Sequence, residues 1–300
     1  MPAAALLAIA HGTRNPRGPE EMAALLGLVR ERIDAPVANA WLEDDLAAPD
    51  PVTAAAHLVD AGAAEIVTLP FLVFGAGHAK TDVPAGLAAI HDAYPGVGLR
   101  HGRVLGLHPG LFALARERVT RARPWGDPPG EREALLVTAA GSSDPDANGD
   151  LAKAARFLAE TTGHRWAEIA YAGVTWPTAD VALRRLAAAG ARRVVRFSWS
   201  LLAGVLEQRV DRWADEVAAA TDLEIVDAGR FGPDAAVADA VVDRYREALD
   251  GEARMNCDLC QFRLPLPGRQ HRAGLPSAGG TGRQVRPDAR EIQQDGGAGP

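Results

Sequence analysis

Two histidines and a glutamate stand where strand-like segments of the amino-terminal half end. His11 follows an apolar run at 6–10, Glu43 follows the segment 37–41, and His78 lies beyond a β-branched segment at 65–70. Two imidazoles and a carboxylate suit a first-row divalent ion such as Fe²⁺, Co²⁺, Ni²⁺ or Zn²⁺. Imidazole also accepts protons near neutral pH. We therefore expect catalytic metal handling by His11, Glu43 and His78.

These side chains need a scaffold that gathers them at one place. Strand-like segments at 6–10, 37–41, 65–70 and 98–105 alternate with helix-like segments at 20–32, 51–61, 81–93 and 109–121. Asp50 and Pro51 have the residue types of a helix N-cap and first turn. This alternation predicts a parallel sheet with helices on both faces, and ligands bind such sheets beyond the carboxyl ends of the strands.

The pattern repeats after a linker rich in proline and glycine at 122–132. Residues 134–143 repeat 6–14, and the Ala-Gly-Ala turn at 61–63 recurs at 189–191. We predict an α/β fold of two duplicated, doubly wound parallel-sheet domains, 1–121 and 133–250, followed by a mostly disordered tail at 251–300. The repeat sets Ala140 opposite His11 and Val205 opposite His78, which assigns the active site to the first domain.

Composition narrows the class of protein. The chain is 47% hydrophobic and 24% charged, as in globular proteins, and its net charge of −7 argues against nucleic-acid binding. No run of eighteen apolar residues and no signal peptide is found, so no membrane span is expected. Two cysteines exclude a disulfide framework, and a reducing cytoplasm is the predicted location.

Three motifs resemble one known family, the sirohydrochlorin chelatases. They are His-Gly-Thr-Arg at 11–14, Trp-Leu-Glu at 41–43, and the long block from Pro70 through Gly-His at 77–78 to Pro84. The resemblance implies a class II chelatase fold, with two domains facing a cleft, and insertion of Co²⁺ or Fe²⁺ into sirohydrochlorin on the route to cobalamin or siroheme. It also implies that His11 and His78 handle the metal, that Glu43 is their acidic partner, and that Lys80 and Asp82 orient them.

The substrate implied by this resemblance is flat and rich in carboxylates. Phe71–Phe74 and Trp41 would suit its apolar face, and the candidate cations for its carboxylates are Arg14, Arg17, Lys80, Arg100 and Arg103. The alternatives are a non-catalytic metal or tetrapyrrole carrier and a ferrochelatase acting on another porphyrin. A histidine phosphatase is disfavoured, because Ala10 stands where that class has arginine before the histidine.

A cysteine pair, Cys257 and Cys260, follows the last expected helix. Two thiolates cannot complete the four-ligand set of a zinc or iron–sulfur site alone. Longer members of the chelatase family carry a similar Met-x-Cys-x-x-Cys segment associated with an iron–sulfur cluster, and a homodimer sharing one cluster would supply four thiolates. Shared zinc and free thiols are the alternatives. The long, duplicated form with this tail resembles cobaltochelatases, which favours Co²⁺ over Fe²⁺.

Overall fold

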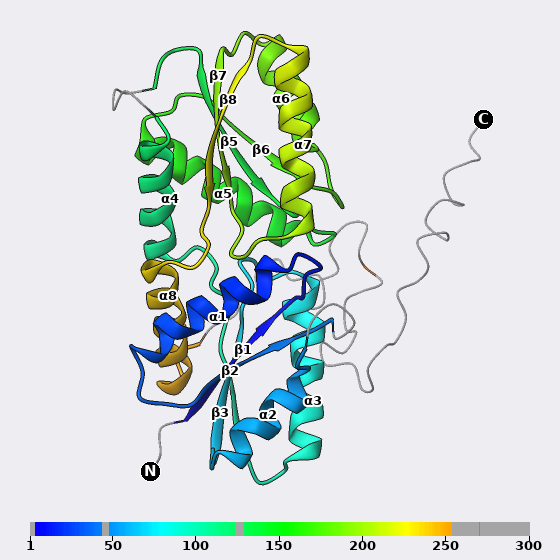
Figure 1. Cartoon of the computed structure of the whole chain (residues 1–300), viewed down its shortest axis with the longest axis vertical. Coiled ribbons are helices and arrows are strands. Elements are labelled where there is room, and N and C mark those ends of the chain that lie inside the picture. Colours follow the sequence, from blue (N-terminus) through cyan, green and yellow to red (C-terminus); the bar gives the residue numbers. More distant parts are fainter. Residues whose placement is uncertain (1–3, 44–47, 124–128, 254–269, 271–300) are drawn as a thin grey trace, which may run out of the picture.

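A computed structural model describes residues 4–43, 48–123, 129–253 and 270. Two four-stranded parallel sheets, each with helices on both faces, lie one beyond the other along the molecule (Figure 1). The strand order is β2-β1-β3-β4 in the first sheet and β6-β5-β7-β8 in the second. The predicted duplicated α/β architecture is confirmed. The first unit here denotes β1 to α4, and the second unit β5 to α8.

The strands of both sheets are short, and the central strands β1, β3, β5 and β7 are almost entirely buried, whereas the edge strands β4 and β8 contain no buried residue. All six residues of β1 are buried, as expected of a parallel strand covered on both faces. The strands are β1 (Ala5–Ala10), β2 (Val37–Trp41), β3 (Glu65–Pro70), β4 (Gly98–His101), β5 (Glu133–Ala139), β6 (Ala167–Tyr171), β7 (Arg193–Ser198) and β8 (Glu224–Arg230).

Helices α2 and α4 of the first unit begin at the predicted residues, whereas α1 begins three residues earlier than predicted and the predicted helix at 81–93 is divided between η1 and α3. Asp50 caps α2, and its carboxylate accepts hydrogen bonds from the N–H groups of Val52 (2.8 Å) and Thr53 (3.1 Å). The predicted strand at 98–105 is too long, because Leu105 instead donates to the Leu72 carbonyl beyond β3. The helical elements are α1 (Arg17–Arg30), α2 (Pro51–Asp60), the π-helical turn η1 (His78–Asp82), α3 (Val83–Ala93) and α4 (Pro109–Arg121).

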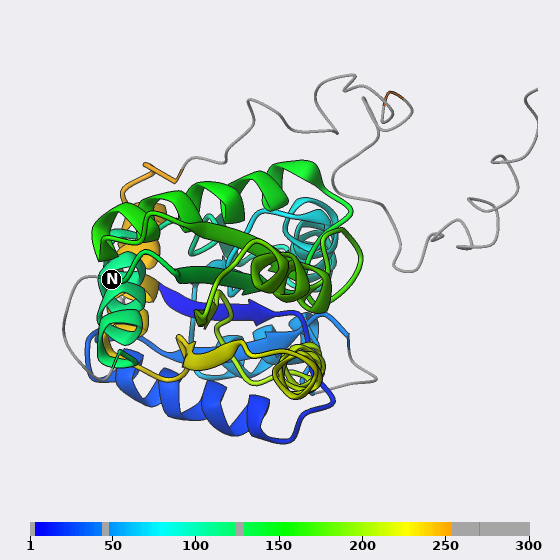
Figure 2. The same cartoon turned by 90° about the horizontal axis from the view of Figure 1, so that it is seen from above.

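The two units exchange their last helices. The second unit contains α5 (Pro145–Thr162), α6 (Ala179–Ala188), α7 (Val205–Ala220) and α8 (Ala235–Leu249). Helix α4 packs on β7 and β8 of the second sheet, whereas α8 packs on β3 and β4 of the first. The two helices follow one another along one side of the molecule (Figures 1 and 2). A single central core therefore contains apolar side chains of both units.

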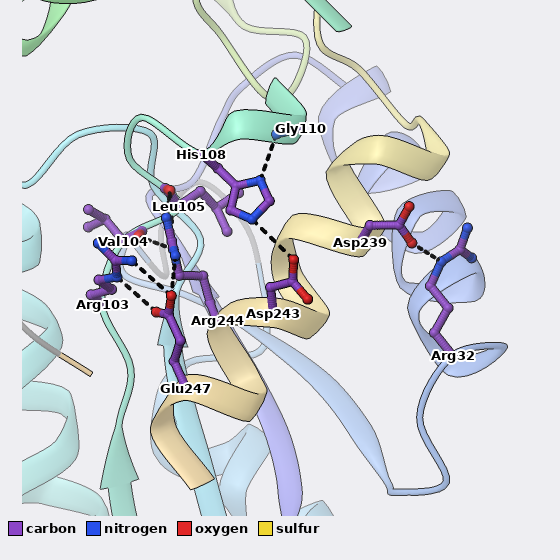
Figure 3. A network of polar contacts seen from close by, with 10 residues as sticks. All are labelled: Arg32, Arg103, Val104, Leu105, His108, Gly110, Asp239, Asp243, Arg244 and Glu247. Carbon is purple, nitrogen blue, oxygen red and sulfur yellow. Dashed lines mark hydrogen bonds and ion pairs between the residues drawn. The ribbon is translucent and has the colours of Figure 1, made fainter. Parts of the chain in front are cut away.

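Polar contacts fix α8 against the first unit (Figure 3). Arg244 of α8 donates to the Leu105 carbonyl (2.8 Å), and Arg103 forms a two-pronged pair with Glu247 (2.8 Å each). His108 accepts from the Gly110 N–H at the start of α4 (3.1 Å), and its Nε2 lies 3.2 Å from Asp243. His108 thus joins the two exchanged helices.

Parts of the predicted organisation lie outside the described residues. The residues outside the description include most of the segment 251–300, with Cys257 and Cys260, and positions 124–128 of the linker. The domain boundaries therefore stay a prediction. No helix in the described part of the chain is long and apolar enough to cross a membrane.

Candidate metal centre

The carboxyl ends of three neighbouring strands position the candidate ligands. Strand β1 pairs with β2 on one side and with β3 on the other. Backbone pairing continues past the strands, with Leu42 N–H donating to Ala10 O (2.8 Å) and Glu43 N–H to His11 O (3.0 Å). This register holds Glu43 beside His11. Gly12 has φ 113°, a conformation that favours glycine, and it turns the chain directly after His11.

His11, Glu43 and His78 come together at this edge. One potential ligand atom from each lies within 4.8 Å of the others. His11 Nε2 is 3.6 Å from Glu43 Oε1, and the two imidazole centroids are 4.2 Å apart with their planes at 83°. Three ligands leave coordination positions open for exchange, in contrast to a closed structural zinc site. The three residues predicted from separate loops thus form one cluster, and their metal-binding role remains a prediction.

Hydrogen bonds orient both imidazoles. His11 Nδ1 lies 3.2 Å from the Gly12 carbonyl, which can only accept, so the proton sits on Nδ1 and Nε2 carries the lone pair. His78 Nδ1 is hydrogen-bonded to the carboxylate of Asp82, four residues later in η1. A carboxylate on the outer nitrogen is the usual way of orienting a histidine ligand. Asp82 therefore fits the orienting role that the resemblance implied.

Burial and local charges favour the ligand forms of these side chains. Burial lowers the pKa of His11, and the neighbouring His78 acts in the same direction, against the opposing effect of Glu43. Burial acts to raise the pKa of Asp82, but the hydrogen bond and charge of His78, the Thr81 hydroxyl and the charge of His11 together outweigh it, and the net pKa lies below the usual range. A neutral imidazole and an ionised carboxylate are the states in which these residues bind or orient a cation.

A cavity of about 520 Å³ lies between the two units beside this cluster. His11, Glu43 and Trp41 line it from the first unit, together with the apolar segment 71–74. Leu201, Leu202 and other aliphatic side chains line it from the second unit. The expectation that Trp41 and Phe71–Phe74 form a pocket wall is confirmed. The apolar part of this lining suits the apolar face of a ligand.

Arg14 lines the cavity, whereas the other four candidate cations are paired. Lys80 is buried between Asp144 (2.9 Å) and Asp146 (3.0 Å) of the second unit, so it is not available to a ligand. The remaining three pair with carboxylates of the protein: Arg17 with Glu21, Arg100 with Glu65, and Arg103 with Glu247.

Sequence reasoning missed three acidic residues near this site. Asp144 and Asp146 hold Lys80, and Glu207 of α7 lines the cavity. A signal for Glu207 was present in the repeat. Because His78 and Val205 are the first residues of η1 and α7, Glu207 takes the position that Lys80 has in the first unit.

Comparison with known proteins defines the class. The two-unit α/β fold resembles that of the solved structure of SirB from Bacillus subtilis with Fe³⁺, with a TM-score of 0.72, 23% identity, and coverage of 85% of this chain and 100% of that one. At this identity the likeness concerns the fold. The fold, with a cavity between its two units, thus places the protein in the structural class of SirB.

The sequence identifies the family within that class. The CbiX family model matches residues 5–122 and 134–248. A sirohydrochlorin cobaltochelatase of Priestia megaterium is 31% identical over 262 residues, which cover 87% of this chain and 85% of that protein. A sirohydrochlorin ferrochelatase of the same organism is 23% identical over 206 residues, covering 69% and 76% respectively. The chain belongs to the CbiX family.

Proposed function

We propose that this protein inserts a divalent metal ion into sirohydrochlorin, with Co²⁺ favoured over Fe²⁺. The main structural support is the cluster of His11, Glu43 and His78, whose potential ligand atoms lie within 4.8 Å of one another beside the cavity between the units. Membership of the CbiX family and 31% identity to a cobaltochelatase support the substrate and favour Co²⁺.

The proposed reaction exchanges the ligands of a metal ion. Neutral imidazoles hold the ion loosely enough to release it, since three protein ligands leave positions open to ring nitrogens. The apolar walls would take the face of the macrocycle, and Arg14 would pair with one of its carboxylates. Two pyrrole N–H protons leave as the ion enters, so the charge of the macrocycle is unchanged.

Metal insertion is tested with the anaerobic protein, sirohydrochlorin, and Co²⁺ or Fe²⁺, followed by visible absorbance. We expect multiple turnovers, faster with Co²⁺, and a fall of His78→Ala to the enzyme-free rate. His57→Ala, an exposed histidine of α2, is the matched control and should retain turnover. An unchanged rate in His78→Ala would remove the site assignment. Tight stoichiometric binding without product would identify a carrier instead.

We separately propose an iron–sulfur cluster at Cys257 and Cys260, shared in a homodimer. This proposal rests on the cysteine spacing and on its resemblance to the Met-x-Cys-x-x-Cys segment of longer family members. Anaerobic purification should then give a coloured dimer containing iron and sulfide, and Cys257→Ala should lose both the colour and the dimer. A colourless protein without iron would exclude the cluster. A cytoplasmic location likewise stays a prediction from the sequence.

A further inference from the structure

Glu207 is a partly buried carboxyl group on the second-unit side of the cavity. It is the third residue of α7, and its side chain is 16% exposed. It lines the same cavity as His11 and Glu43 but belongs to the other unit. Its ion-pair partner within the described part of the chain is Arg230, whose Nη1 lies 3.5 Å from Oε2. A carboxyl group in this setting needs a reason, because burial of an incompletely paired charge is costly.

The cations near Glu207 are already shared with other acids. Arg230 of β8 is hydrogen-bonded to Glu21 of α1, which also pairs with Arg17 at 3.4 Å. Arg196 of β7 is held by Asp211 of α7 (2.6 Å) and Asp227 of β8 (3.1 Å). Four carboxylates thus share three guanidinium groups; they are Glu21, Glu207, Asp211 and Asp227 with Arg17, Arg196 and Arg230. With all groups ionised, the cluster has one negative charge in excess, and binding of one proton makes it neutral.

The environment sets the affinity of Glu207 for a proton. Burial raises its pKa to about 7, against the opposing effect of Arg230, and Asp211 and Asp227 add to the rise while Arg196 opposes it. At neutral pH such a group exchanges a proton readily in both directions, which is what a general base in a catalytic cycle requires.

Metal insertion creates a need for such an acceptor. Two ring N–H bonds must break while the imidazole lone pairs are occupied by the ion. The outer nitrogens are occupied as well, since His11 Nδ1 is bonded to Gly12 O and His78 Nδ1 to Asp82. The metal cluster on the first-unit side is therefore poorly placed to take both protons.

We propose that Glu207 accepts the pyrrole protons from the ring face that is turned towards the second unit. This inference rests on the proposed chelatase function. In each cycle the carboxylate takes one proton, the electron pair of the N–H bond stays on the nitrogen, and that nitrogen binds the ion. The carboxylic acid then releases the proton to water at the cavity mouth. Two such cycles release two protons for each divalent ion inserted, and no oxidant or reductant is needed.

The test compares Glu207→Gln with Glu216→Gln, which makes the same change at an exposed position of the same helix. Turnover is measured between pH 6 and 9 with saturating Co²⁺ and sirohydrochlorin, above the enzyme-free rate. We expect kcat of Glu207→Gln to fall about 100-fold, with an unchanged KM for the macrocycle and an unchanged Kd for Co²⁺ alone. Wild type and Glu216→Gln should share a kcat that rises with pH through about 7, because the ionised carboxylate is the acceptor. The rise should be absent in Glu207→Gln.

Glu207→Asp keeps a titratable group, so it should retain the rise with pH at a lower rate. Loss of kcat without loss of the pH dependence in Glu207→Gln would indicate a structural role and overturn the inference. Equal rates in Glu207→Gln and Glu216→Gln beside an active wild type would also overturn it and leave the proposed function intact. A wild type without turnover would overturn both.

Discussion

The two α/β units have the same backbone plan but different side chains at the carboxyl edge of the sheet. Leu42 N–H donates to Ala10 O in the first unit, and Ala172 N–H donates to Ala139 O at the equivalent place in the second (2.8 and 2.9 Å). Gly12 and Gly141 both have positive φ after the first strand of their units. The residues matching His11, Glu43 and His78 are Ala140, Gly173 and Val205. Both copies of the scaffold have the same turns, but only the first carries the candidate ligands.

The interface between the units shows a second difference, in the sign of charge. Lys80 of the first unit is buried among acids of the second, whereas its counterpart Glu207 lies near Arg230, which is bonded to Glu21 of the first. Lys80 therefore contacts the other unit directly, whereas Glu207 pairs within its own unit with an arginine that makes the contact to the first. Two identical units could not place opposite charges at these equivalent positions.

The largest effect on activity is expected when His78 of the first unit is replaced by valine, the residue at the equivalent position of the second unit. His78→Val should reduce metal insertion to the enzyme-free rate, since an aliphatic side chain cannot bind the ion. Adding the reciprocal Val205→His, at a position that also lines the cavity, should not restore insertion to His78→Val, because Ala140 and Gly173 supply no further ligands in the second unit. Insertion rates under anaerobic conditions and circular dichroism spectra check activity and folding. Retained activity in His78→Val would mean that the first unit is not the metal-handling one.

The contact at Lys80 should dominate stability. Lys80→Met removes the ammonium group that lies between Asp144 and Asp146, and loss of one partner of a buried pair costs about 3–5 kcal/mol. The free energy of unfolding is measured by urea denaturation. Lys153→Met, at an exposed lysine of α5, is the control and should change stability by less than about 0.5 kcal/mol. In the triple variant Lys80→Met, Asp144→Asn, Asp146→Asn most of the loss should be recovered. Equal stabilities of Lys80→Met and the control would contradict a structural role for the pair.

Glu207 should make stability depend on pH. Its folded pKa of about 7 lies above its ordinary value of 4.5, so its contribution is fully present below pH 4.5 and is lost as pH rises through 7. The loss by pH 8 is about 3 kcal/mol in the wild type and absent in Glu207→Gln. The urea midpoint of Glu207→Gln should therefore increase relative to that of the wild type between pH 5 and pH 8. Parallel shifts in both proteins would show that Glu207 titrates normally.

The smallest expected effect concerns the orientation of His78. Asp82→Asn keeps a hydrogen-bond acceptor but removes the charge, and loss of such a partner typically lowers metal affinity or activity about 10–100-fold. Competition with a chromophoric chelator measures the Co²⁺ affinity. Asp92→Asn, at an exposed residue of α3, is the control. Unchanged affinity in Asp82→Asn would mean that the contact with His78 has no part in metal binding.

Local features of the chain could be predicted from sequence because neighbouring residues determine them. The bounds of β2, β3 and α4 and the cap at Asp50 follow from β-branched runs, proline positions and capping residues. The cluster of His11, Glu43 and His78 also follows, because parallel strands bring their carboxyl ends to one edge.

Contacts between distant segments could not be predicted in the same way. Apolar periodicity shows that α4 and α8 have a buried face, but not that each covers the sheet of the other unit. The sequence does not show that Lys80 pairs with Asp144 and Asp146, because these partners lie 64 and 66 residues further along the chain. Lys80 is therefore expected to be free for the substrate until its contacts are seen. Glu207 looks like an ordinary acidic residue in the first turn of a helix, which the helix dipole explains equally well.

The exchange of α4 and α8 has a consequence for how this chain can be divided. A cut between 121 and 133 would separate each sheet from the helix that closes its core, since α4 would leave with the first fragment and α8 with the second. Neither fragment would have a complete core, and reassembly would require each fragment to pack its last helix on the sheet of the other. The two copies therefore depend on each other, and shortening this protein to one copy would require a new cover for the sheet face that the exchanged helix leaves open.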